Sequence, residues 1–107
     1  MDVRLYEDHR GRWPVQEFID DLSSRTEIDQ ILVHVRELGI QGHLLRRPVS
    51  AALGDGIYEL RPGPNRILYG FDGGDAVLLH ALRKKTREIP DEDIRLALRR
   101  FKEWRQR

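Results

Sequence analysis

The segment Phe-Asp-Gly-Gly-Asp-Ala, residues 71–76, constrains the fold more than any other part of the chain. It lies between two apolar runs, and glycine readily takes the positive φ angles that tight hairpins require. If Gly73 and Gly74 form the loop, Asp72 faces Asp75 and the pairing of two strands is determined. This register predicts three further cross-strand pairs: Leu68 with Leu79, Ile67 with His80, and Arg66 with Ala81.

A preceding strand begins after Gly56 and is joined through the Pro-Gly-Pro-Asn segment, so that Arg61 faces Arg66. Side chains alternate between the faces of a strand. One predicted face carries Ile57, Glu59, Arg61, Arg66, Leu68, Leu79, Ala81, Arg83 and Lys85. The other carries Tyr58, Leu60, Ile67, Tyr69, Phe71, Leu78, His80 and Leu82, and its apolar character predicts that it packs against helices.

Helical patterns flank this three-stranded meander. After a weak N-terminal strand signal at Val3 and Leu5, Pro14 opens a helix whose apolar positions are Val15, Phe18, Ile19 and Leu22. An N-cap pattern of Thr26 with Asp29 begins a second helix, which Gly39 is expected to end. Residues 40–55 resemble connecting structure. A C-terminal helix starts after Pro90, with an apolar stripe at Ile94, Leu98, Phe101 and Trp104.

Composition limits the chemistry. A chain of 107 residues predicts one domain, residues 1–107. Without cysteine or a histidine cluster, we expect no metal site, no thiol nucleophile and no cofactor. No signal peptide or membrane-length apolar run is evident, so a cytoplasmic protein is expected, with no membrane partner. Residues 1–42 carry a net charge of −4 and residues 73–107 a net charge of +4, which suits a polyanionic partner or a solvated basic helix.

The predicted pairing of Arg61 with Arg66 is an electrostatic conflict. Like charges directly opposite on neighbouring strands destabilise a sheet unless an anion joins them. The pair therefore indicates a site for a phosphate, and the competing explanation is that Glu59 or Asp55 neutralises it. Two further arginines, Arg46 and Arg47, lie in the connecting segment and are candidates for substrate contact.

The ordered set Tyr-Glu-Leu-Arg, Asn-Arg-Ile-Leu-Tyr-Gly-Phe-Asp, Gly-Gly, Val-Leu-Leu-His-Ala-Leu-Arg-Lys-Lys-Thr and Pro-x-x-x-Ile-x-x-Ala resembles the HigB-like, phage-derived branch of the RelE/ParE toxin superfamily. The likeness covers roughly residues 56–100. It implies a small α+β fold: an N-terminal strand, two helices, a three-stranded antiparallel meander and a C-terminal helix. It also implies the toxin of a type II toxin–antitoxin pair, an endoribonuclease (mRNA interferase) that cleaves mRNA on the ribosome without a metal and uses the substrate 2′-hydroxyl as nucleophile.

The resemblance assigns roles to individual residues. Arg61 and Arg66 match basic strand positions, and Lys84 and Lys85 match a basic cluster after the last strand. Arginine suits stabilisation of a phosphorane, because its planar fork binds two oxygens and stays charged. Lysine beside other cations suits proton transfer. The predicted catalytic residues are Arg61, Arg66, Lys84 and Lys85, with Arg83, Arg46 and Arg47 as substrate contacts and Glu59 or His80 as candidate base.

RelE carries two lysines where this chain has Ile57 and Glu59, so a RelE-type lysine base is absent here. Two alternatives stay open: a ParE-like inhibitor that acts by binding DNA gyrase, and an inactive phage-derived interaction module. The expected partners are the ribosome, mRNA and a cognate antitoxin, which is expected to be a small helix-turn-helix protein. Such an antitoxin would dock on the basic face.

Overall fold

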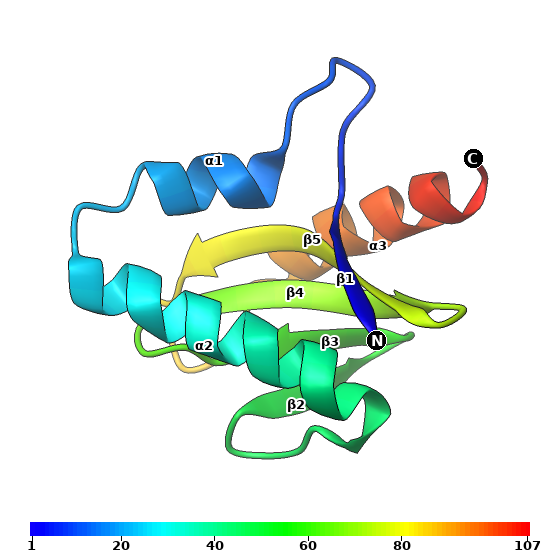
Figure 1. The fold of residues 1–107 in the computed structure, drawn as a ribbon. Coiled ribbons are helices and arrows are strands. Elements are labelled where there is room, and N and C mark those ends of the chain that lie inside the picture. The colour runs from blue at the N-terminus through cyan, green and yellow to red at the C-terminus, as the bar shows by residue number, and fades with distance from the viewer.

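The computed structural model describes residues 1–107 and has the α+β architecture that the sequence predicts (Figure 1). Three α-helices and five strands follow one another along the chain. Their order is β1 (Asp2–Leu5), α1 (Pro14–Asp20), α2 (Arg25–Gln41), the short 3₁₀ helix η1 (Gly42–Leu44), β2 (Ser50–Gly54), β3 (Ile57–Leu60), β4 (Asn65–Asp72), β5 (Asp75–Arg83) and α3 (Asp91–Arg105).

All five strands form one mixed sheet in the order β1-β5-β4-β3-β2. Strands β2 to β5 pair antiparallel, whereas β1 pairs parallel with β5. The predicted three-stranded meander is therefore one strand too short, and the prediction that residues 40–55 are connecting structure is wrong for β2. Its sequence, Ser-Ala-Ala-Leu-Gly, has little of the β-branched and aromatic content typical of strands. It becomes the edge strand through its pairing with β3.

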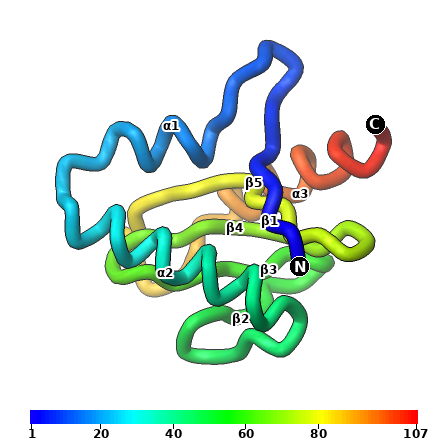
Figure 2. The backbone as a smooth tube through the Cα atoms, in the orientation of Figure 1, coloured from blue at the N-terminus to red at the C-terminus, as the bar shows by residue number.

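The helices cover both faces of the sheet. Helices α1 and α2 lie on one side and α3 on the other, as both views of the chain show (Figures 1 and 2). The core under α1 and α2 is built mainly on Ile31, Leu38, Leu60, Ile67, Tyr69 and Leu78. The core under α3 is built mainly on Ile57, Leu68, Val77, Leu79, Ala97 and Phe101. Helices thus cover both faces of the sheet.

The register between β3 and β4 agrees with the prediction: Leu60 pairs with Ile67, so the chain continues toward Arg61 and Arg66. In the β4–β5 hairpin, Asp72 pairs with Asp75 as predicted, but the pairing shifts by one residue at Leu79. Leu68 therefore faces His80, Ile67 faces Ala81, and Arg66 faces Leu82. The three predicted pairs are wrong, because a β-bulge inserts one unpaired residue.

The bulge also exchanges the faces of the residues that follow it. Side chains at 80 and 82 turn toward α3, and those at 81 and 83 turn toward α2, the reverse of the prediction. A one-residue shift reverses every later side chain because strand side chains alternate with a period of two.

The ends of α2 also differ from the prediction. Ser24, not Thr26, is the N-cap, and its Oγ accepts a hydrogen bond from the backbone N–H of Glu27 at 3.2 Å. Gly39 lies inside the helix, and Gly42 ends it with a φ of 53°. That conformation favours glycine, and the predicted end at Gly39 is one turn too early. None of the helices has the length and apolar character required to cross a membrane.

Candidate anion-binding site

A pocket of about 250 Å³ opens on the α3 face of the sheet, and we call it the anion pocket. The ends of β2 and β3, the loop after β5 and the first turn of α3 form its walls. Three of its lining residues are cations and three are acids. The lining comprises Leu53, Glu59, Arg61, Lys84, Arg87, Glu88, Ile89, Asp91 and Ile94.

Glu59 is a charged side chain that is buried in the wall of this pocket. It is only 5% exposed, and its Oε1 lies 3.3 Å from Nε of Arg61. Its second oxygen, Oε2, is buried without any hydrogen-bond partner. A buried carboxylate oxygen without a partner is costly and calls for an explanation such as a functional role or an unseen ligand. Glu59 therefore pairs with Arg61, as the competing explanation held, and keeps one buried oxygen without a partner.

Arg66 lies beside this pair rather than in the pocket lining. One terminal nitrogen donates to the carbonyl oxygens of Gly63 and Asn65, both at 2.7 Å, while its Nε is buried and unpartnered. Burial lowers the pKa of the Arg66 guanidinium, the neighbouring Glu59 opposes this, and Arg61 adds to it. The structure thus brings two arginines and one carboxylate together, as the predicted register requires.

The two lysines that follow β5 differ in position: Lys84 lines the anion pocket and Lys85 does not. The backbone N–H of Lys84 donates to the Pro64 carbonyl oxygen at 2.9 Å, and this residue lines the anion pocket. Lys85 is exposed and lies outside the lining. Arg87, which sequence reasoning did not select, supplies the third cation of the pocket. Nothing in the local pattern marks it, because it lies in the loop between β5 and α3.

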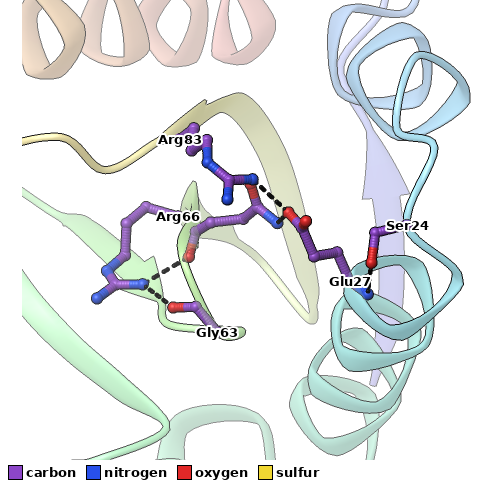
Figure 3. Close-up of polar contacts among 6 residues, drawn as sticks. Ser24, Glu27, Gly63, Arg66 and Arg83 are labelled. Atoms are coloured by element: carbon purple, nitrogen blue, oxygen red, sulfur yellow. Dashed lines mark hydrogen bonds and ion pairs between the residues drawn. The ribbon is translucent and has the colours of Figure 1, made fainter.

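Arg83 does not join this group. The bulge turns it toward α2, where its guanidinium donates to Glu27 at 2.6 Å and Glu27 also accepts from Asn65 at 2.9 Å. These contacts lower the pKa of Glu27, the Asn65 hydrogen bond most strongly. Figure 3 shows Arg83 directed at Glu27 while Arg66 turns away toward Gly63. The prediction that Arg83 shares a face with Arg61 is wrong.

His80 also lies elsewhere than predicted. Its Nε2 is 2.7 Å from an Asp93 carboxylate oxygen on α3, and the imidazole does not line the anion pocket. It faces the core under α3, whereas the alternation of side chains along the strand predicted that it would face the core under α1 and α2. Leu68 separates it from Glu59 in the same cross-strand row. Of the two candidate bases, Glu59 is therefore the one in contact with the pocket.

Arg46 and Arg47 line a different pocket on the α2 side of the sheet. They are therefore separated from Arg61 by the sheet itself, since Tyr58 of the second pocket and Glu59 of the first are consecutive residues of β3 and point to opposite faces. No three His, Asp or Glu side chains converge as a metal site would require.

The anion pocket brings together three cations, Arg61, Lys84 and Arg87, and one buried carboxylate, Glu59. A base together with cations is the combination that cleavage of a phosphodiester requires.

Comparison with known proteins adds one finding. Residues 17–102 match the sequence model of a family described as phage derived protein Gp49-like (DUF891). No curated protein matches the chain.

Proposed function

Because this chain belongs to the phage-derived Gp49-like family, which is part of the RelE/HigB-type toxin superfamily, we propose that it is a HigB-like toxin of a type II toxin–antitoxin system. Its proposed activity is ribosome-dependent, metal-independent cleavage of mRNA. The observation that carries this proposal is the buried, unpartnered Oε2 of Glu59 in a pocket with three cations.

The proposed reaction is an internal transfer at phosphorus. Glu59 accepts the proton of the 2′-hydroxyl, the freed oxygen attacks the adjacent phosphorus, and the bond from phosphorus to the 5′-oxygen breaks. Lys84 donates a proton to that leaving oxygen. The products are a 2′,3′-cyclic phosphate and a 5′-hydroxyl. Arg61, with Arg66 behind it, stabilises the negative charge of the phosphorane, a contribution worth about 10²–10³ in rate for one well-placed donor.

A geometric comparison favours Glu59 over the other acid–base candidates. Lys85 is exposed and His80 is paired with Asp93, whereas Glu59 lines the pocket, with one oxygen against Arg61 and the other without a partner.

The first experiment induces the wild-type chain in cells and maps mRNA 5′ ends. New ends inside translated frames, carrying 5′-hydroxyls, are expected together with growth arrest. An Arg61→Ala/Arg66→Ala chain should produce neither. Arg83→Ala is the matched control, because it removes an arginine of the neighbouring strand that points to the opposite face. Circular dichroism of all three chains checks that they fold alike.

Other outcomes separate the alternatives. Growth arrest with intact mRNA contradicts the nuclease and leads to supercoiling assays for the gyrase inhibitor. A soluble wild-type chain without arrest points to the inactive interaction module. Equal cleavage of naked RNA and ribosome-bound mRNA would contradict the dependence on the ribosome, while leaving the nuclease itself in place.

Family membership also suggests an antitoxin partner. We propose that part of its contact is the outer face of α2 and η1, where large apolar side chains are exposed. Val33 is 58% exposed, Ile40 66% and Leu44 73%. The spacing from Val33 to Ile40 is seven residues, which puts both side chains on one helical stripe. An amphipathic antitoxin helix would cover this stripe, at a distance from the anion pocket on the other side of the sheet.

A further inference from the structure

The second pocket is the larger of the two and lies on the α2 side of the sheet. Its volume is about 440 Å³, within the range of small-molecule sites. We call it the aromatic pocket. The edge strand β2, the segment from Gly42 to Arg47, and the outer ends of β3 and β4 form its walls. Its chemistry is carried by His43, Arg46, Arg47, Tyr58, Tyr69 and Phe71.

Aromatic rings dominate this pocket. The rings of Tyr58 and Tyr69 are stacked, with centroids 5.5 Å apart and an interplanar angle of 25°. Phe71 meets both rings edge-on, with centroid distances of 5.4 and 5.6 Å, and the centroid of the exposed His43 ring lies 3.9 Å from that of Phe71. Tyr58 and Phe71 are only partly buried, so they keep surface open to the pocket. A set of rings with free surface binds another flat ring by stacking.

The charges of the aromatic pocket differ from those of the anion pocket. Its lining includes Arg46 and Arg47 but no aspartate or glutamate, whereas three acids line the anion pocket. Arg46 is fixed, since its guanidinium donates to the carbonyl oxygens of His43 and Leu45. Arg47 is exposed and takes part in no ion pair or side-chain hydrogen bond. The pocket therefore presents uncompensated positive charge beside its rings.

Polar groups complete the pocket wall. The Ser50 hydroxyl and the Tyr69 phenol are hydrogen-bonded at 2.6 Å, and both side chains are almost fully buried. Each hydroxyl retains capacity for one more hydrogen bond. The pocket thus offers aromatic rings, positive charge and hydroxyl groups. A ligand that matches all three has a flat ring with polar edges and an attached anion. A nucleotide meets this description, because its base can stack and its phosphate can pair with arginine.

We propose that the aromatic pocket is a nucleotide-binding site, in which a base stacks on Tyr58 and meets Phe71 edge-on, and its phosphate contacts Arg47. Its occupant is either a free mononucleotide or one nucleotide of a single-stranded RNA. The RNA form rests on the proposed function, whereas the mononucleotide form does not. Both pockets adjoin the β2–β3 edge on opposite faces, so an RNA strand that occupies both would pass around β2.

The test titrates adenosine 5′-monophosphate, adenosine and inorganic phosphate separately into the full-length chain and follows amide signals by NMR. Signals of His43 and Ala52 should move with the nucleotide. The nucleotide should bind about tenfold or more tightly than adenosine or phosphate, because only it provides both stacking and charge. The same result is expected in the Arg61→Ala/Arg66→Ala chain, whose changes lie on the opposite face.

Ala52 offers a matched pair of variants, because it is exposed, lines the aromatic pocket and pairs with Tyr58 in the sheet. Ala52→Glu should weaken nucleotide binding about tenfold through charge repulsion, and Ala52→Gln, of the same size, should not. Equal binding by the two variants overturns the proposal, as does an absence of shifts at His43 and Ala52. Loss of binding in the Arg61→Ala/Arg66→Ala chain also overturns it, since the nucleotide would then occupy the anion pocket.

A second arm identifies the source of the nucleotide. Single-stranded RNA containing 5-iodouridine is irradiated with the chain, and crosslinked peptides are mapped. Crosslinks at Phe71 or His43 support the RNA form, and nucleotide binding without such crosslinks supports the free mononucleotide. The mapping of mRNA ends in cells is independent of both arms. If the chain binds the nucleotide but cleaves no mRNA, the nucleotide site is supported and the proposed nuclease function is contradicted.

Discussion

The contact between Gly70 of β4 and Phe101 of α3 yields a quantitative prediction about the packing that positions the anion pocket. A Cβ atom added at Gly70 would lie 2.5 Å from Cε2 and 2.7 Å from Cζ of the Phe101 ring. Carbon atoms in contact prefer about 3.5–4.0 Å, so the overlap is about 1 Å. Phe101 is only 2% exposed and cannot move aside into solvent. Gly70→Ala must therefore displace the ring or the helix.

The expected cost is about 2 kcal/mol. Overpacking a core typically costs about 1–3 kcal/mol, and an overlap with two ring carbons belongs in the upper part of that range. Replacing glycine by alanine returns about 0.4–1 kcal/mol by reducing the entropy of the unfolded chain. A net loss of about 2 kcal/mol lowers the urea midpoint by about 1 M for a chain of this size.

The assay is urea unfolding followed by circular dichroism, in the Arg61→Ala/Arg66→Ala chain so that growth arrest does not limit expression. Gly74→Ala is the control, because a Cβ at Gly74 meets nothing within 4 Å. Its midpoint should equal or exceed that of the parent. Adding Phe101→Leu to Gly70→Ala should recover part of the loss, with a coupling of about 1 kcal/mol. Identical midpoints for Gly70→Ala and Gly74→Ala would refute the described packing of α3 on β4.

Three further predictions follow from individual contacts. Burial and the hydrogen bond to Glu103 raise the pKa of Tyr6 to about 12, so its contribution to stability is complete below pH 10 and lost as the pH rises toward 12; Tyr6→Phe should flatten that alkaline loss in pH-dependent unfolding. The pKa of Glu27 is lowered, so its contribution is present above its ordinary value near 4.5 and lost as the pH falls through the folded-state pKa; Glu27→Gln should reduce the urea midpoint at pH 7 and reduce it progressively less as the pH falls below 4.5. Ile40→Asp should weaken capture of the co-expressed antitoxin while mRNA cleavage persists, and unchanged capture would exclude the α2 stripe as the contact.

Much of the fold follows from local pattern. The Gly73–Gly74 turn predicted the Asp72–Asp75 pair, and apolar spacing predicted all three helices. The strand β2 escaped prediction because its stability comes from its neighbour β3 and not from its own residues. The aromatic pocket escaped prediction for the same reason. Tyr58 and Phe71 were predicted to lie in the core. The pocket beside them is walled in part by β2, which was not predicted as a strand.

The candidate site was predicted in part, and the β-bulge at Leu79 explains the remainder. Strand parity placed Arg83 with Arg61 and placed His80 on the opposite face, and one unpaired residue reverses both. Each reversed side chain then meets an acid on a helix: Glu27 pairs with Arg83, and Asp93 pairs with His80. The helices thus supply partners for two groups that were predicted to act at the site, Arg83 as a substrate contact and His80 as a candidate base. Glu59 remains as the one buried carboxylate of the anion pocket with a free oxygen, and its contact with Arg61 crosses no bulge. A mechanism based on this carboxylate consequently depends on the β3–β4 register, which the sequence predicts correctly, and not on the β4–β5 register, which it does not.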